Sequence, residues 1–328
     1  MRQCAVTRQK MPSGGSTATR TSLTPGVMIN YRAARLDDGD ESNKRGPPNQ
    51  LLPDRVLHPR FEERKAGIGV WTICHRETIA RLAMGGPHHQ TLSRTRSAVS
   101  PDIAESVYAQ LCERVEQELA LLRNRLQSSN VRAAKRPAGA SGAASEKPVV
   151  LRRLPRAEAE ALLAGGDKQE SMIAVFDLHD MSERGDQMSD PISNANANRI
   201  DETYSAPVDV SETDLPMLGP ESRVPLYPLA RLFPPQRLGH LRELLEGVLR
   251  VEALEGKRAQ RAAGQPRVNS ARVMDTSDLV ALYAHSEVNG TGRAGDVGAD
   301  LAVAFWRLRC FFGLGWEEFD VDRSGRKI

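Results

Sequence analysis

The sequence predicts a mainly α protein: a small C-terminal helical module and one isolated amphipathic helix, with long disordered regions between them. Aromatic residues make up only 5% of the 328 residues, and four of the seven phenylalanines lie between residues 305 and 319. Aromatic side chains bury large areas, and a segment without them struggles to offset an ordering cost of about 1–2 kcal/mol per residue. A second observation is that apolar residues recur at helical spacing in only a few segments of the sequence. We therefore expect a dense core only in the last third of the chain.

The N-terminal segment has the composition of a targeting peptide. Residues 1–36 contain six Lys/Arg, eight Ser/Thr and no Asp or Glu. A basic, Ser-rich and acid-poor segment is typical of organelle transit peptides. Two interpretations stay open. The segment is either a disordered mitochondrial transit peptide or a disordered basic tail, and the second interpretation covers the case of a gene-model artefact. Residues 37–99 are charged and contain Pro and Gly, so we expect them to be mostly disordered, with a short strand or helix at 68–84.

The clearest element is a helix of about residues 101–126, within the segment 100–130. Ser100 is a good N-cap and Pro101 suits the first helical position. Apolar residues recur every three or four positions from Ile103 to Leu126, which is one face of a helix. This stripe must be buried against another part of this chain or against a partner's helix. For the second alternative the candidate partner-binding residues are Val107, Leu111, Val115, Leu119 and Leu122.

The remaining segments alternate between linkers and short elements. Residues 131–150 are a linker rich in Ala, Gly and Ser, and 151–181 hold a short helix (155–164) and a strand (172–178). Residues 182–222 are an acidic disordered tract, interpreted as a solvated linker or as a docking segment for a basic partner. The module at 223–320 should contain helices near 235–254, 278–286 and 299–312, followed by a tail at 321–328.

Two patterns carry candidate chemistry. Arg307 and Arg309 alternate with aromatic residues, as in single-strand RNA binders, although a core helix explains the same pattern; both arginines are candidate partner-binding residues. Asp177, His179 and Asp180 resemble the metal-binding opening of metal-dependent phosphoesterases. The family's second motif normally lies a helix further on, but here only six residues intervene, and its Gly-Asn-His motif is missing. We expect no catalytic residue, cofactor, metal or small-molecule substrate.

The net charge and the spacing of the cysteines limit the classes of function that fit the chain. The net charge is +3, so the whole chain has no strong field for nucleic acid or membranes. The four cysteines have no zinc or disulfide spacing, which favours a reducing compartment, and no apolar run reaches the roughly 18 residues of a membrane span. The sequence predicts a non-catalytic accessory or interaction protein of a mitochondrial assembly (ribosome or respiratory complex) in the matrix. The alternatives are a cytosolic or nuclear helical scaffold and a metal-dependent phosphoesterase-like enzyme.

Overall fold

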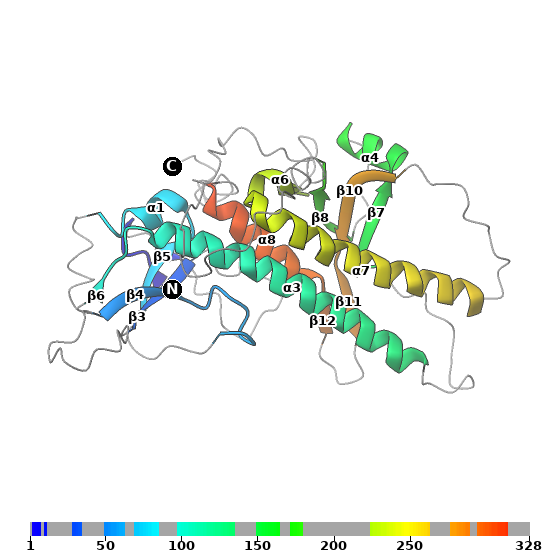
Figure 1. The fold of residues 1–328 in the computed structure, drawn as a ribbon, viewed down its shortest axis with the longest axis horizontal. Coiled ribbons are helices and arrows are strands. Elements are labelled where there is room, and N and C mark those ends of the chain that lie inside the picture. Colours follow the sequence, from blue (N-terminus) through cyan, green and yellow to red (C-terminus); the bar gives the residue numbers. More distant parts are fainter. Residues whose placement is uncertain are drawn as a thin grey trace, which may run out of the picture. The chain divides into compact units, whose positions relative to one another are not determined.

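The chain is a mixed α/β protein, so the prediction of a mainly α fold is wrong. The computed structural model describes residues 2–7, 10–11, 28–34, 49–62, 69–84, 97–134, 149–164, 171–179, 224–262, 276–288 and 294–313. They form two compact units, unit 1 with Met1–Glu118 and Val303–Ile328, and unit 2 with Leu119–Ala302. Each unit contains a four-stranded sheet with both antiparallel and parallel pairs (Figure 1). The acidic tract at 182–222 and the tail at 321–328 lie outside the described residues.

The sheet of unit 1 has the strand order β5-β3-β4-β6. Strand β3 (Met28–Ala34) lies inside it and pairs antiparallel with β4 (Asn49–Asp54) and β5 (Gly69–Ile73). The short strand β6 (Ser97–Ala98) runs parallel to β4. A second, two-stranded sheet joins β1 (Arg2–Gln3) to β2 (Lys10–Met11), and helix α1 (Arg76–Ala80) contacts β5.

This sheet corrects two predictions about the N-terminal third. Strand β3 belongs to the segment 1–36 that we expected to be a disordered transit peptide, yet Ile29 and Tyr31 are fully buried. Strand β4 lies in 37–99, which we expected to be mostly disordered, whereas β5 and α1 fall in 68–84, where we expected a short strand or helix. Cys4, Met28 and Ile73 form one buried cluster, so the first residues of the chain are part of the core of unit 1.

The sheet of unit 2 has the order β7-β10-β8-β9. Strand β10 (Thr276–Tyr283) pairs antiparallel with β7 (Leu151–Pro155) and β8 (Met172–Asp177), and β9 (Leu226–Pro228) runs parallel to β8. The expected helix at 278–286 is therefore wrong. Leu279 to Tyr283 are all buried, so this strand is apolar on both faces and shows no alternation.

Helices complete both units. In unit 2, α4 (Arg156–Leu163) packs on β7 and β10, and α7 (Pro235–Ala262) contacts β7 and the short α6 (Leu229–Leu232). Strands β11 (His285–Val288) and β12 (Ala294–Val297) form an antiparallel pair. Helices α3 (Ile103–Ala134) and α8 (Ala299–Phe311) each have residues in both units. These helices and β8 confirm the predicted elements near 101–126, 155–164, 172–178, 235–254 and 299–312. Within the described residues, no helix combines the length and the apolar character that crossing a membrane requires.

Candidate functional site

A buried carboxylate ends strand β4 of unit 1. The side chain of Asp54 is 1% exposed, and its Oδ2 lies 3.0 Å from Arg32 Nε and 3.7 Å from Arg55 Nε. Asn30, directly opposite Asp54 in the sheet, donates a 2.7 Å hydrogen bond from Nδ2 to the same oxygen. A buried charge is tolerated only where it is paired and hydrogen-bonded. The cluster therefore fixes the end of β4 and the backbone that follows it.

Gly69 makes room for this cluster. A Cβ at Gly69 would lie 2.3 Å from Asn30 Oδ1, closer than real Cβ contacts. Neither Asn30 Oδ1 nor Asp54 Oδ1 has a hydrogen-bond partner among the described residues. The amide of Asn30 is thus held between the Asp54 carboxylate and the backbone of β5.

The chain leaves Asp54 through an unusual backbone conformation. Arg55 has φ of 63°, in the left-handed region that L side chains rarely adopt, at a cost of about 1–3 kcal/mol. Its backbone N–H donates to Glu62 Oε1 at 3.1 Å, which closes the segment on itself. We call residues 55–62 the Arg55 loop.

Two helices hold the Arg55 loop in place. The backbone N–H of His58 donates to Gln117 Oε1 of α3 at 2.9 Å. Arg307 of α8 donates from Nη1 to the carbonyl oxygen of Val56 at 3.5 Å, and Val56 itself is fully buried. Ordering a loop when it binds a partner costs free energy. Because α3 and α8 already order the Arg55 loop, binding through it requires less of this ordering.

The Arg55 loop exposes an aromatic side chain next to a basic one. Phe61 is 54% exposed, and its ring lies edge-on to His58 with 5.9 Å between the ring centroids. Arg60 is exposed and makes no ion pair with any described residue, and the side chain of Arg55 is 52% exposed. Aromatic residues and arginines are enriched in protein interfaces and in their energetic hot spots. The geometry therefore fits docking better than catalysis.

The predicted stripe of α3 lies inside the fold. Its five candidate residues are all buried: Val107, Leu111, Val115, Leu119 and Leu122. These side chains form core contacts within this chain, which was the first of the two alternatives for the stripe. A partner helix could reach them only if the fold opened.

Arg307 and Arg309 lie on a core helix. Phe305 and Phe311 of α8 are fully buried, so their rings are not open to stack on bases, and Tyr108 of α3 stacks on Phe311. Arg309 is buried and Arg307 is half-buried. Burial lowers the pKa of Arg307, and the nearby Arg114 lowers it further, whereas Cys74 opposes the shift. The structure assigns Arg307 a place beside the Arg55 loop instead of on an RNA-binding surface.

The buried groups beneath the sheet are unreactive at neutral pH. Burial raises the pKa of Cys74 to about 12, against a smaller lowering by Arg307. Burial likewise raises the pKa of Tyr31, whose hydroxyl accepts a 3.3 Å hydrogen bond from Thr72. Because the thiolate is the nucleophilic form of cysteine, Cys74 is not suited to covalent catalysis.

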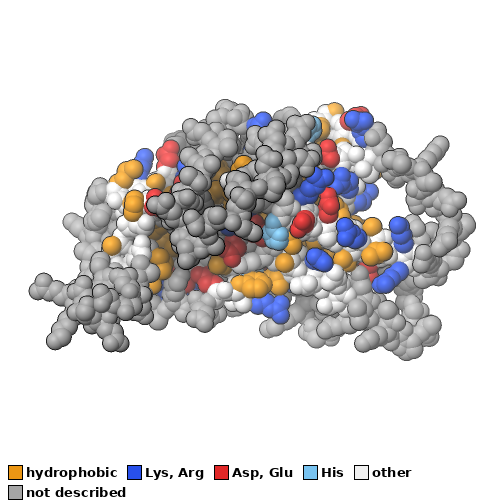
Figure 2. All heavy atoms as spheres, viewed as in Figure 1, with side chains coloured by type: hydrophobic (Ala, Val, Ile, Leu, Met, Phe, Trp, Pro, Cys, Tyr) orange, Lys and Arg blue, Asp and Glu red, His pale blue; other side chains and the backbone are white. Residues whose placement is uncertain are grey.

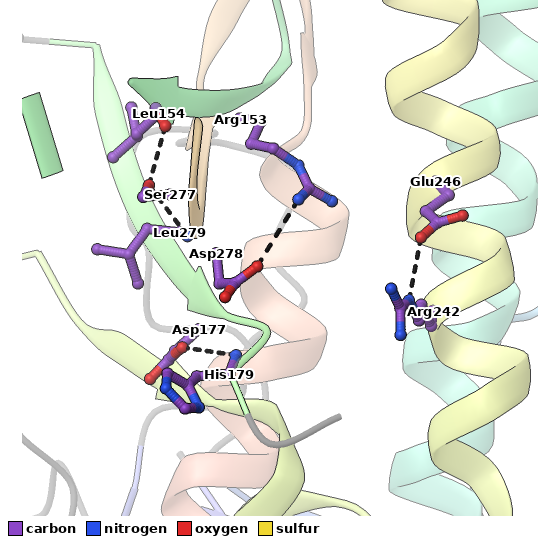
Figure 3. A network of polar contacts seen from close by, with 9 residues as sticks. All are labelled: Arg153, Leu154, Asp177, His179, Arg242, Glu246, Ser277, Asp278 and Leu279. Atoms are coloured by element: carbon purple, nitrogen blue, oxygen red, sulfur yellow. Dashed lines mark hydrogen bonds and ion pairs between the residues drawn. The ribbon is translucent and has the colours of Figure 1, made fainter. Parts of the chain in front are cut away.

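The phosphoesterase-like motif forms a turn at the end of β8 in unit 2. Asp177 Oδ1 accepts a hydrogen bond from the backbone N–H of His179 at 2.9 Å (Figure 3), a local arrangement common after strands. In the same view Arg153 Nη1 lies 3.8 Å from Asp278 Oδ1. In the described part of the chain, no three His, Cys, Asp or Glu side chains are grouped to hold a metal ion. Asp180 lies outside the described residues.

Sequence reasoning missed the Arg55 loop. Its pattern, Asp54-Arg55 followed by His58, Arg60 and Phe61, stands out only once β4 is recognised as a strand. No protein-family model matches the chain, and no curated protein or solved structure matches it either.

Proposed function

We propose that the chain is a non-catalytic accessory protein that docks onto a partner protein through the Arg55 loop, as part of a larger assembly. The observation that carries this proposal is a loop held by both α3 and α8 that nevertheless exposes Phe61. The complementary partner surface is an apolar pocket with an acidic group beside it, because the exposed Arg60 directly precedes Phe61.

Physical considerations support this use of the loop. Full burial of a phenylalanine is worth about 1.5–3 kcal/mol, and aromatic anchors in preorganised loops dominate many interfaces. The left-handed conformation of Arg55 supports the same interpretation, since backbone strain clusters at functional sites.

The location we propose is the mitochondrial matrix, on the acid-free composition of residues 1–36, with cytosol or nucleus as the alternative. Removal of this segment would take away β3, the strand between β4 and β5. Cys4 is also buried. We therefore expect an imported chain to keep its N-terminus.

The test is affinity capture of the full chain from fractionated source cells, with Phe61→Ser compared with Leu163→Ser. Leu163 is a matched control because it is also 54% exposed, on α4 of unit 2. We expect Phe61→Ser to lose one set of captured proteins by at least about tenfold, while Leu163→Ser keeps it. Identical capture by the two variants would remove the Arg55 loop from the proposal. Both substitutions are at the surface and should change stability by less than about 0.5 kcal/mol, which thermal unfolding checks.

A further inference from the structure

Helix α3 contacts the middle of helix α7 in unit 2, and basic residues lie at and beyond this contact on both helices. Arg123 of α3 packs against Gly247 of α7: a Cβ there would lie 3.4 Å from Arg123 Cδ. Both helices run in the same direction from this point, so their C-terminal ends lie at the same end of the helix pair (Figure 1). We call this region the basic end; its exposed cations are Arg123, Arg250, Lys257 and Arg258.

These four cations differ from the other arginines that the structure describes in this unit. None of them forms an ion pair with a described residue, whereas Arg242 lies 3.0 Å from Glu246 and Arg156 lies 3.6 Å from Glu160. Figure 2 shows Lys and Arg side chains gathered on the surface where Figure 1 places α7. Among the described residues these cations therefore have no ion-pair partner, and Glu252 and Glu255 are the acidic residues of α7 between Arg250 and Lys257.

The amino-acid sequence extends the same pattern. Residues 123–145 contain five Lys/Arg and no Asp or Glu, and residues 256–274 also contain five and none. One or two cations in the last turn would suffice to offset the helix dipole. The number of cations exceeds that structural requirement and calls for another explanation.

We propose that the basic end binds the phosphate backbone of RNA. On α7, Arg250, Lys257 and Arg258 span eight residues, or about 12 Å along the axis. A segment of this length can contact more than one successive phosphate of one strand. Contacts of this kind fix the position on a nucleic acid without reading its sequence.

A membrane surface fits the basic end less well than RNA. Membrane-bound helices place a broad apolar face opposite their cations. Here the exposed neighbours on α3 are Asn124, Gln127 and Ser128, and Leu254 is the large hydrophobic residue exposed on α7 in the described part of the chain. The inference is independent of the Arg55 loop, which belongs to unit 1.

The test is fluorescence anisotropy of the purified full chain with labelled single-stranded RNA of about 20 nucleotides. If four cations each neutralise one phosphate, affinity should fall about fiftyfold between about 50 and 200 mM salt. Reversal of Arg250, Lys257 and Arg258 to Glu should weaken binding at low salt by more than about tenfold. Reversal of the locally paired Arg156 and Arg242 to Glu should change it less than about twofold.

Two results would overturn the inference. One is equal weakening by both sets of reversals, or binding unchanged in both, because the basic end would then play no particular part. The other is binding to vesicles of phosphatidylserine and phosphatidylcholine without binding to RNA, which would identify the surface as a lipid-binding one. Circular dichroism of each variant confirms that a loss of binding is not a loss of folding.

Discussion

Replacing Gly69 by alanine tests the packing beneath the Arg55 loop. The added Cβ would lie 2.3 Å from Asn30 Oδ1, so this oxygen must move by about 1.1 Å to reach an ordinary contact of about 3.4 Å. Asn30 is buried and its other amide atom is bound to Asp54 at 2.7 Å, so a shift of that size breaks the bond. Loss of a buried hydrogen bond to a charged group costs about 1.5–3 kcal/mol.

The assay is thermal and urea unfolding of the full chain. We expect Gly69→Ala to lower the free energy of unfolding by about 2 kcal/mol and the melting temperature of the transition of unit 1 by about 4–8 °C. Gly239→Ala is the matched control: Gly239 is at an exposed position of α7, and no atom lies within 4 Å of a Cβ there. That control should raise stability by up to about 1 kcal/mol.

A double-mutant cycle separates this mechanism from a general loss of stability. In the Asn30→Ala background the oxygen that blocks the methyl group is gone, so Gly69→Ala should cost close to nothing. The coupling between the two substitutions should then be about 2 kcal/mol. Strictly additive effects, or a Gly69→Ala variant as stable as the unmodified chain, would refute the reasoning.

Three further predictions concern the core, the pH dependence and the N-terminus. Leu111→Ala should lower the free energy of unfolding by about 2–5 kcal/mol because Leu111 is fully buried, whereas Leu254→Ala, at an exposed position, should change it by less than about 0.5 kcal/mol; equal effects in urea unfolding would contradict a core role for the α3 stripe. The pKa of Cys74 is raised to about 12 in the folded chain, so Cys74 ionises first in the unfolded chain and the free energy of unfolding falls from about pH 9 upward. At about pH 10.5 this fall should be about 2 kcal/mol smaller in Cys74→Ala than in the unmodified chain. An equal fall in the two proteins would exclude Cys74 as its cause. Intact mass of the protein from source cells should include residues 1–36, because β3 is a structural strand; a chain beginning after Ala34 would contradict the fold.

The sequence predicted the helices well because their patterns are local. The stripe from Ile103 to Leu126 has helical period over six turns, and Ser100 and Pro101 mark its start. Helix α4 and strand β8 were also predicted near their observed bounds. Each of these elements can be identified from its own residues.

The strands of unit 1 could not be predicted in the same way. Strand β3, with the sequence MINYRAA, lies in an acid-free segment whose overall composition suggests a transit peptide. Its stability comes from pairing with β4 and β5, which is not visible in a short window. The composition of residues 37–99 was misleading for the same reason, since β4 is stabilised by pairing with β3 and β6. Strand β10 was mistaken for a helix because a short apolar run buried on both faces shows no period.

The candidate site depends on contacts between distant residues. Arg307 was singled out from its aromatic neighbours, but its hydrogen bond to Val56 joins positions 251 apart in the sequence. The bond from His58 to Gln117 likewise joins positions 59 apart. No local pattern specifies these pairs, so the ordered state of the Arg55 loop could be recognised only in the fold.

The most direct test of the central proposal is site-specific photocrosslinking in source cells. A photoreactive phenylalanine analogue is placed at position 61 in one variant and at position 163 in the other, two positions of equal exposure at 54%. If the Arg55 loop docks onto a partner, position 61 should give one dominant protein adduct that is lost when Arg60 is also changed to Glu. Position 163 should not give this adduct. The same weak adducts from both positions, or an adduct that is insensitive to Arg60→Glu, would contradict the proposed docking function.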